Sequence, residues 1–470
     1  MVDPLHELVE LPEETRVAKG IEHTPREIES QPRVWMKNFE MLRSREDEIR
    51  SFVESRILRN RRVRVILSGA GTSNFIGLSV ENLLRKRWQV DVETRGTTDI
   101  VTGWDSIFLK DAETTLISFA RSGNSPESAG TLLLANQFLE KISHIIVTCN
   151  KEGKLARMAA DGENVLLLLS PEEANDKGLA MTASFTTMVS TAQFLAYIQD
   201  LNEYERIIRS LSKATENLMK DYSSLLKEIS DLDFRRAFFL GSRALYGCAV
   251  ESGLKLQEMT AGKIICKPDS FMGFRHGPEV AVNDESLVVF YVSTDPFVRR
   301  YELDLIEDIH AKRLGMMKIA VCNRSDEELA EHADHIIEFD PHREFDIPDL
   351  CRPIMDVTVA QILALFKSLN LGLKPDNPSE SGVITRVVKG VKIYDYEKFK
   401  KEGTTFKKLE RIVDTLFFTP SETSACLQLA DFCAYATRIH FDLLKSKKER
   451  GRRFNQIEHK FDEYGIKLFP

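Results

Sequence analysis

Short apolar runs alternate with longer segments of helical length in the first 170 residues of the chain. The runs are nearly continuous in apolar character and rich in leucine or β-branched residues, as strands buried on both faces should be. They are VRVILSG (63–69), TTLISFA (114–120), ISHIIVTCN (142–150) and ENVLLLLS (163–170). This alternation predicts an α/β unit built on a doubly wound parallel sheet.

The same pattern returns in the second half of the chain. Three later segments resemble the earlier strands and the turns that follow them: RRAFFLGSR (235–243), SLVVFYVSTD (286–295) and MMKIAVCNRSDEELA (316–330). The offsets between corresponding residues are 172, 172 and 173, for Gly69 to Gly241, Ser122 to Thr294 and Asn150 to Asn323. A nearly constant offset predicts an internal duplication of one α/β domain, with the boundary near residues 200–215.

Length and composition narrow the class of protein. A chain of 470 residues exceeds the usual size of one hydrophobic core, so two or more domains are expected. The net charge of -8 argues against a broad nucleic-acid surface, because binding to phosphate backbones requires concentrated Lys and Arg. The N-terminus lacks the features of a secretory signal and no apolar run approaches membrane-spanning length, so we expect a cytoplasmic protein. The seven cysteines include no CxxC pair, which indicates small buried side chains and not a disulfide or zinc framework.

Two loops rich in hydroxyl groups follow strands of the first repeat. They are SGAGTSNFIG (68–77) and ARSGNSPES (120–128). In an open parallel sheet, ligands bind at the carboxyl ends of the strands, where backbone N–H groups at helix N-termini attract anions. The glycine-rich loop matches neither GxGxxG nor the P-loop pattern, and a tight turn would explain it equally well if it stood alone. Two such loops at corresponding strand ends favour a phosphate site.

These motifs carry a family resemblance. SGAGTSNFIG, RSGNSPES and MTASFTTM (181–188) resemble the signatures of SIS domains, the sugar isomerase domains that bind phosphosugars. Four separated motifs further resemble the tagatose-6-phosphate ketose/aldose isomerase family, whose members include galactosamine-6-phosphate deaminases/isomerases: HTPREIESQPRVW (23–35), RSGNSPES, FRHGPE (274–279) and TRVVKGVKIY (385–394). The resemblance covers roughly residues 20–395 and implies two tandem SIS domains, each a three-layer αβα sandwich.

The expected organisation has five segments. They are an N-terminal helical segment (1–45), a first SIS domain (46–208), a second SIS domain (209–375), a tail segment of the family (376–400) and an appended, mainly helical extension (401–470). The extension contains an apolar-periodic helix (424–446) and a basic run (445–453), which indicates a solvated helix end rather than a nucleic-acid patch. A short part of it faintly resembles proteins with an expected RNase-H-like fold, with Asp431 at an acidic position, but the earlier acidic strands of such a nuclease are absent.

The resemblance implies which residues bind the sugar phosphate. The expected phosphosugar-binding residues are Thr72, Ser73, Arg121, Ser122, Asn124 and Ser125. The family pattern usually has a hydroxyl residue where this chain has Ala120, so one phosphate hydrogen bond is expected to be missing. No metal or organic cofactor is expected, because no His, Asp and Glu cluster has metal-ligand spacing.

The second repeat carries the candidate chemistry. Glu251, Lys255 and Glu258 follow one another at helical spacings of four and three, so they fall near one face. Such spacing is also typical of an exposed ion-pair stripe. His276 follows in an RHGP turn, and the related isomerase domain of glucosamine-6-phosphate synthase has a similar glutamate-bearing helix and histidine turn.

The roles follow from aldose–ketose chemistry and from the resemblance. Moving a proton between neighbouring carbons needs a carboxylate base, for which Glu258 is the candidate. Opening the sugar ring suits an imidazole, and His276 is expected to reach the site of a neighbouring subunit in a homodimer or homotetramer. Lys255 is expected to stabilise the enediolate oxygen. Glu251, Arg386 and Lys389 are further possible site residues, although Lys389 is equally consistent with a surface lysine.

Two classes of function remain open from the sequence. The first is a phosphosugar enzyme, either an amino-sugar 6-phosphate deaminase acting on galactosamine 6-phosphate or a close epimer, or a simple ketose/aldose isomerase. The second is a phosphosugar-binding regulator, which needs the phosphate loops but no base. Glu258 and His276 favour the enzyme. A glutamine-dependent synthase is disfavoured, since no nucleophilic N-terminal cysteine is present.

Overall fold

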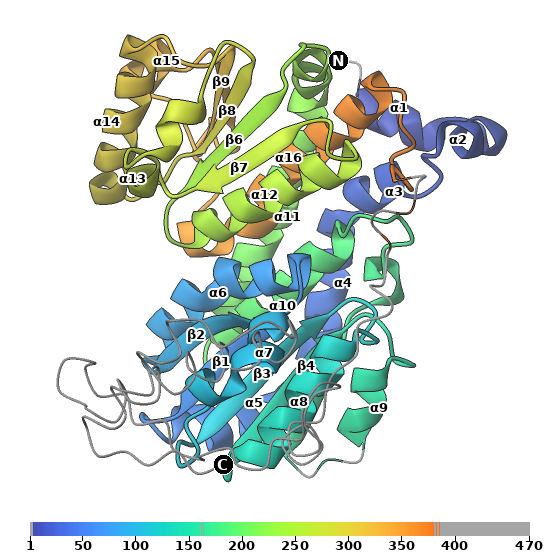
Figure 1. Cartoon of the computed structure of the whole chain (residues 1–470), viewed down its shortest axis with the longest axis vertical. Coiled ribbons are helices and arrows are strands. Elements are labelled where there is room, and N and C mark those ends of the chain that lie inside the picture. The colour runs from blue at the N-terminus through green and yellow to red at the C-terminus, as the bar shows by residue number, and fades with distance from the viewer. Residues whose placement is uncertain (1–2, 161, 163, 380–381, 383–384, 386–470) are drawn as a thin grey trace, which may run out of the picture. The chain divides into compact units, whose positions relative to one another are not determined.

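Two five-stranded parallel sheets form the framework of the protein (Figure 1). The computed structural model describes residues 3–160, 162, 164–379, 382 and 385, all within the unit Met1–Ile393. The first sheet has the order β2-β1-β3-β4-β5, with bounds Asp91–Gly96, Arg64–Gly69, Thr114–Ala120, Ile142–Thr148 and Val165–Leu169. The second has the order β10-β9-β8-β6-β7, with bounds His335–Glu338, Met317–Cys322, Ser286–Tyr291, Arg236–Gly241 and Ile265–Asp269. The predicted tandem α/β fold is confirmed, and the extension 401–470 lies outside the described residues.

The two sheets correspond strand by strand. In the first sheet Arg64 of β1 pairs with Thr114 of β3, and in the second Arg236 of β6 pairs with Ser286 of β8. Both pairs are related by the offset of 172 seen in the sequence. Loops that follow equivalent strands therefore occupy equivalent positions in the two domains.

Helices precede, connect and follow the strands. The N-terminal segment contains α1 (Pro4–Glu10), α2 (Glu13–Lys19), α3 (Thr24–Glu29), α4 (Gln31–Arg43), α5 (Glu46–Val53) and the π-helical turn η1 (Glu54–Leu58). The first domain adds α6 (Thr72–Trp88), α7 (Thr97–Ile107), α8 (Pro126–Phe138), α9 (Lys154–Ala160), η2 (Glu172–Ala174) and α10 (Ala183–Ala196). The second adds α12 (Ala244–Met259), α13 (Phe271–Phe274), η3 (Pro278–Ala281), α14 (Pro296–Ala311), α15 (Glu327–His332), η4 (Asp349–Cys351) and α16 (Pro353–Asn370). Between them runs α11 (Leu201–Ser230), a continuous helix that contains the expected boundary at 208/209.

Each sheet is covered by helices on both faces. Every residue of β3 is buried, and alternate side chains enter two different apolar clusters, as for Ile117 and Leu116. The cluster on one face of each sheet is shared, because it contains residues of both sheets and of α4, α6, α10, α11, α12 and α16. The two domains thus have one continuous core between them, built from the inner helices of both.

The helices α6 and α12 cross at very close range in this shared core. Gly247 of α12 lies at the crossing, where an added Cβ would be 2.4 Å from the backbone nitrogen of Ser79 on α6. That separation is far inside van der Waals contact, so only glycine permits this approach. The crossing brings the first turn of α6 alongside the polar face of α12.

A buried ion group ties the end of β8 to the start of α16. Arg352 is fully buried, and its guanidinium lies 2.7 Å from Asp356 Oδ2 and 2.8 Å from Asp349 Oδ1. It also donates to the backbone oxygen of Val292 at 2.8 Å. Burial raises the pKa of Asp356 to about 6, although the Arg352 charge acts in the opposite direction.

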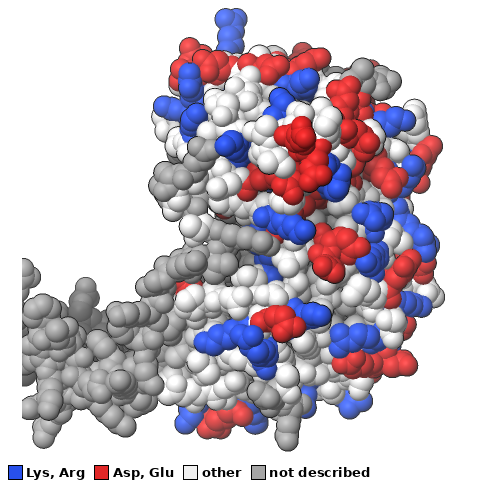
Figure 2. Space-filling view, turned by 90° about the vertical axis from the view of Figure 1, so that its right-hand side faces the viewer, with Lys and Arg blue, Asp and Glu red and all other residues white. Residues whose placement is uncertain are grey.

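The surface of the described residues mixes both signs of charge. Acidic and basic side chains are interspersed on the face drawn in Figure 2. No helix in the described part of the chain combines the length and the apolar character needed to cross a membrane.

Candidate active site

The polar face of α12 has a buried lysine at its centre. Lys255 has no exposed side-chain surface, and its Nζ lies 2.5 Å from Glu258 Oε2 and 3.4 Å from Glu251 Oε1. It also donates to Thr72 Oγ1 at 3.1 Å. Glu251 is fully buried as well, whereas Glu258 is 24% exposed. Of the three charged residues on this face, Glu258 is therefore the one that a ligand can reach.

Thr72 brings the glycine-rich loop of the first domain into the same cluster. It is the first residue of α6, and its hydroxyl donates to Glu251 Oε1 at 3.3 Å while accepting from Lys255. The loop after β1 and the helix after β6 belong to different domains, so the site is composite. Ser73, the next residue of α6, is also buried beside it.

The charges in this cluster are strongly coupled. Burial, reinforced by the negative charge of Glu258, raises the pKa of Glu251 to about 8, against the opposing effects of Lys255 and Thr72. Burial alone would lower the pKa of Lys255, but the two carboxylates outweigh it and the net shift is upward. Burial thus favours the protonated form of Glu251, and Glu258 is the carboxylate nearest to the Lys255 ammonium.

The second hydroxyl-rich loop joins β3 to α8. Ser125 caps α8, with its Oγ accepting from the backbone of Ser128 at 3.2 Å. Asn124 Oδ1 accepts from the backbone of Lys154 at 3.0 Å, and the Asn124 N–H donates to Ser122 Oγ at 3.3 Å. Asn124 and Ser125 therefore shape the loop through contacts within the protein.

Arg121 extends from this loop toward a neighbouring segment. Its Nη1 donates to the backbone oxygens of Gly178 at 3.2 Å and Leu179 at 3.1 Å. Its positive charge makes a small contribution that lowers the pKa of Lys255, against the larger effects of the two carboxylates. Arg121 thus joins the loop after β3 to the segment around Gly178.

The glycine-rich loop of the first domain has an equivalent in the second domain with the same backbone shape but different side chains. Gly71 before α6 and Arg243 before α12 have nearly the same backbone angles, with φ and ψ of 56° and -128° against 54° and -124°. The hydroxyl residues that follow Gly71 are replaced by Ala244 and Leu245.

The loop after β8 in the second domain is hydrogen-bonded to a carboxylate of the same chain. Ser293 Oγ donates to Asp349 at 2.5 Å, and Thr294 donates to the same carboxylate through its N–H and its hydroxyl. A carboxylate of the chain itself therefore occupies the donors that correspond to the phosphate loop of the first domain.

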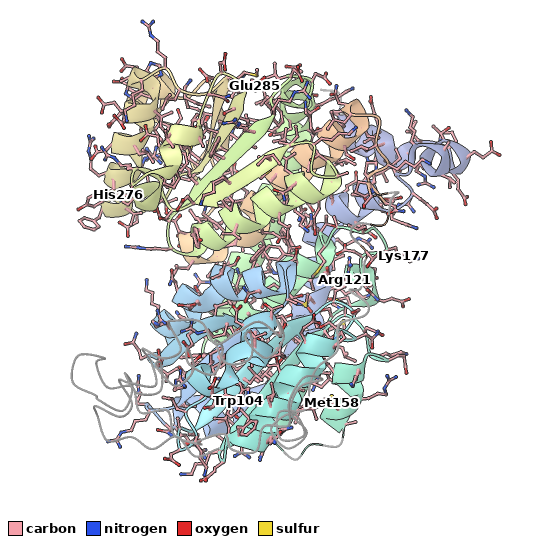
Figure 3. All side chains as sticks on the ribbon, viewed as in Figure 1. Trp104, Arg121, Met158, Lys177, His276 and Glu285 are labelled. Carbon is pink, nitrogen blue, oxygen red and sulfur yellow. The ribbon has the colours of Figure 1, made fainter. Side chains whose placement is uncertain are left out.

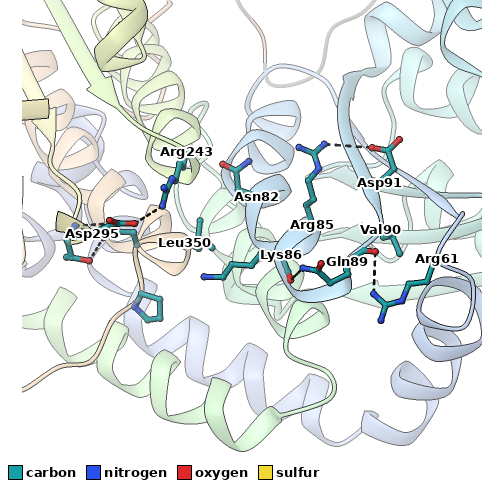
Figure 4. A pocket seen from close by; sticks show the side chains of 13 residues that line it. Arg61, Asn82, Arg85, Lys86, Gln89, Val90, Asp91, Arg243, Asp295 and Leu350 are labelled. Atoms are coloured by element: carbon teal, nitrogen blue, oxygen red, sulfur yellow. Dashed lines mark hydrogen bonds and ion pairs between the residues drawn. The ribbon is translucent and has the colours of Figure 1, made fainter. Parts of the chain in front are cut away.

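A cavity of about 710 Å³ lies beside this second loop (Figure 4). Its lining includes Arg85, Lys86, Arg243, Asp295 and Asp349, and Arg243 is paired with Asp295 at 3.0 Å. None of the predicted site residues lines it. The cavity is therefore separate from the α12 cluster.

His276 is not brought to this cluster within one chain. It is exposed, in the turn between α13 and η3, and its ring makes no hydrogen bond with Glu258 among the described residues. Figure 3 shows His276 and Arg121 well apart, on different domains. Arg386, Lys389 and Asp431 lie outside the described residues.

Sequence reasoning missed one part of this neighbourhood. The segment 176–179, which Arg121 contacts, is held from the other side by Glu27 and Asp376. Glu27 belongs to the HTPREIESQPRVW motif, which carried the resemblance but had no assigned role. The HTPREIESQPRVW motif was the sequence signal that could have pointed to this contact.

A family model now accounts for both domains. The model described as SIS domain matches residues 57–198 and 232–367. The chain belongs to the SIS domain family. The chain is similar to the D-galactosamine-6-phosphate deaminase AgaS of Escherichia coli, with 37% identity over 375 residues. The aligned part is 80% of this chain and 96% of the relative. A relative of the same description from Shewanella sp. (strain ANA-3) is 32% identical over 378 residues, 80% of this chain and 92% of the relative.

Solved structures of related proteins have the same fold as this chain. The chain is similar to the tagatose-6-phosphate ketose/aldose isomerase from Escherichia coli, with a TM-score of 0.73, 35% identity and coverage of 80% of this chain and 96% of that one. The C-terminal domain of glucosamine-fructose-6-phosphate aminotransferase from Francisella tularensis shares the fold, with a TM-score of 0.62 at 19% identity over 74% of this chain and 95% of that one. The predicted SIS membership is confirmed.

Proposed function

We propose that this chain is an amino-sugar 6-phosphate deaminase that converts galactosamine 6-phosphate into tagatose 6-phosphate and ammonia. One observation carries the proposal beyond a shared fold: a partly exposed carboxylate, Glu258, is held by a fully buried lysine next to a hydroxyl-rich loop. The curated relatives named as galactosamine-6-phosphate deaminases align with most of the chain, which supports the same substrate class.

The reaction assigns a role to each group of the site. The hydroxyl-bearing loops of Ser73 and Ser122 bind the 6-phosphate, and Arg121 adds positive charge beside them. Glu258 removes the proton from C2 of the open-chain amino sugar and returns it to C1, through an enolamine. The resulting ketose imine takes up water at C2 and releases ammonia, so no oxidant or reductant is consumed.

The geometry suggests a specific task for Lys255. Its three N–H groups are directed at Glu258, Glu251 and Thr72 inside the protein. Lys255 therefore orients the Glu258 carboxylate, and it reaches the C1 oxygen of the enolamine only if the substrate displaces one of these partners.

His276 completes the site from a second copy of the chain in this proposal. The elements around it expose apolar side chains that a partner would cover, among them Val280 at 91% and Phe297 at 69% exposure. Met272 on α13 and Tyr301 on α14 are exposed as well. Large exposed apolar side chains clustered on neighbouring elements are typical of contact surfaces between subunits.

A mixing experiment tests the shared site. Glu258→Gln and His276→Asn chains, each inactive alone, are unfolded, mixed in equal amounts and refolded together. Random pairing in a dimer with two composite sites restores about one quarter of the wild-type activity, because half of the dimers are mixed and each of these has one intact site. Activity no higher than that of the separate variants would show that each chain builds its site alone.

The proposed function is tested by following ammonia and ketose 6-phosphate together, with galactosamine 6-phosphate and glucosamine 6-phosphate as substrates. Ammonia and ketose in equal amounts from one epimer support the deaminase and identify its substrate. Ketose from the neutral aldose phosphate without ammonia supports a simple isomerase. Binding without turnover supports the phosphosugar-binding regulator, a function that uses the loops but not Glu258.

A further inference from the structure

A short backbone segment, residues 177–179, lies between Arg121 and helix α3, and we call it the ribbon. On one side, Glu27 Oε1 accepts the N–H groups of Lys177 at 2.5 Å and Gly178 at 3.3 Å. On the other side, the carbonyl groups of Gly178 and Leu179 accept from Arg121 Nη1 at 3.2 and 3.1 Å. Figure 3 shows Arg121 and Lys177 next to each other at this point. One carboxyl group and one guanidinium thus bind opposite edges of the same peptide segment.

The ribbon has little freedom to move. The Leu179 N–H donates to the backbone oxygen of Asp376 at 2.9 Å, and the Asp376 carboxylate in turn accepts from Thr24 at the start of α3. A Cβ on Gly178 would lie 2.9 Å from Thr24 Oγ1 and 3.0 Å from Glu27 Oε2. A side chain at residue 178 would therefore press on Thr24 and Glu27, so the segment lies directly against α3.

Arg121 is also the residue next to the hydroxyl-rich loop of the first domain. It directly precedes Ser122 of that loop and is buried. A guanidinium binds in a fixed planar geometry, so the acceptors that it binds fix its orientation. Two carbonyl groups on the ribbon are such acceptors.

We propose that Glu27 is a positioning residue for Arg121: through the 177–179 ribbon it sets the guanidinium in the place where it binds the substrate phosphate. The inference rests on the proposed function, since it requires that Arg121 meet a sugar phosphate. It gives the N-terminal segment, which forms no part of either sheet, a direct connection to substrate binding.

The electrostatics of Glu27 support a role for its neutral form. Burial, followed by the negative charge of Asp176, raises the pKa of Glu27 to about 8, while the N–H groups of Lys177 and Gly178 oppose the shift. Asp376 adds to the increase. At pH 7 the group therefore accepts from the ribbon through a carbonyl oxygen, which a glutamine side chain also supplies.

Three single variants test the proposal in the full-length protein at pH 7. Glu27→Ala is expected to raise KM for galactosamine 6-phosphate about tenfold, equivalent to about 1.4 kcal/mol of binding, with kcat within about twofold of wild type. Glu27→Gln is expected to restore KM to within about twofold of wild type, because it keeps the acceptor. Glu29→Ala is the matched control on the same helix, since within the described part of the chain the side chain of Glu29 pairs with His6 and not with the ribbon, and its KM should not change.

A double-mutant cycle separates positioning from general destabilisation. In an Arg121→Ala background, Glu27→Ala is expected to cause no further rise in the dissociation constant for galactosamine 6-phosphate, measured by calorimetry on Glu258→Gln protein. An equal rise in both backgrounds would overturn the inference, as would a KM of Glu27→Ala equal to that of wild type. Should Glu27→Ala fail to fold, Glu27→Asp, whose carboxyl is one methylene shorter, replaces it with the same expectations. A wild-type chain that binds no sugar phosphate would instead overturn the proposed function, and the inference with it.

Discussion

Replacement of Glu258 by glutamine is expected to lower kcat for deamination by about 10²–10⁴-fold, the usual contribution of a positioned general base. Glutamine has nearly the same shape and still accepts a hydrogen bond from Lys255, which lies 2.5 Å from the carboxylate. The phosphate loops are untouched, so the dissociation constant for galactosamine 6-phosphate should stay within about twofold of wild type. Steady-state ammonia release and calorimetric binding measure the two quantities.

The control for this variant is Glu205→Gln. Glu205 lies on α11 and pairs with Arg209 at 2.7 Å on the surface, so the same chemical change there should leave both constants unaltered. If Glu258→Gln retained more than about one tenth of wild-type kcat, the assignment of Glu258 as the base would be wrong.

Replacement of Arg352 by methionine is expected to lower the free energy of unfolding by about 3–5 kcal/mol, as for other broken buried ion pairs. The guanidinium is fully buried between Asp349 and Asp356, and its loss leaves two carboxylates without a counter-charge. Urea unfolding followed by circular dichroism measures the difference. The matched control is Arg209→Met, an exposed ion-pair arginine, for which a change within about 0.5 kcal/mol is expected.

The loss in the free energy of unfolding caused by Arg352→Met should depend on pH in a defined direction. Asp356 already has a pKa raised to about 6 by burial, and removal of the positive charge raises it further. A carboxyl whose folded-state pKa is raised binds more protons when folded, so its contribution to stability is lost as pH rises through that pKa and regained on acidification. The variant should therefore be closer to wild type at pH 5 than at pH 8. A deficit that grows on acidification would contradict this account.

The central strands were predictable from the sequence because they are buried on both faces. Strands β1, β3, β4, β5, β6, β8 and β9 each fall within an apolar run that the pattern singled out. The strands β2, β7 and β10 were missed: the sequences of β2 and β7, DVETRG and ICKPD, are largely polar, and β10 has only four residues. All three are edge strands, where one side lacks a neighbouring strand and polar side chains reach solvent.

The geometry of the candidate cluster on α12 was predictable in part, because one part of it is local in sequence. The spacing of Glu251, Lys255 and Glu258 on one helix is local, so periodicity alone places them on one face. The contact of Lys255 with Thr72 joins residues 183 positions apart and depends on how two domains pack. The contacts of the 177–179 ribbon with Glu27 and Arg121 could not be predicted either. They use backbone atoms of the ribbon, and every residue type supplies those atoms, so the sequence does not indicate them.

The crossing at Gly247 has a consequence for how substrate enters. The loop proposed to hold the phosphate and the helix that carries the proposed base belong to different domains, and Gly247 of α12 packs directly against the backbone of Ser79 on α6. A hinge between the domains would have to break this crossing and expose the shared apolar core on every cycle. We therefore expect the two domains to keep their arrangement during turnover, with side chains and surface loops moving to admit the sugar and release the ketose.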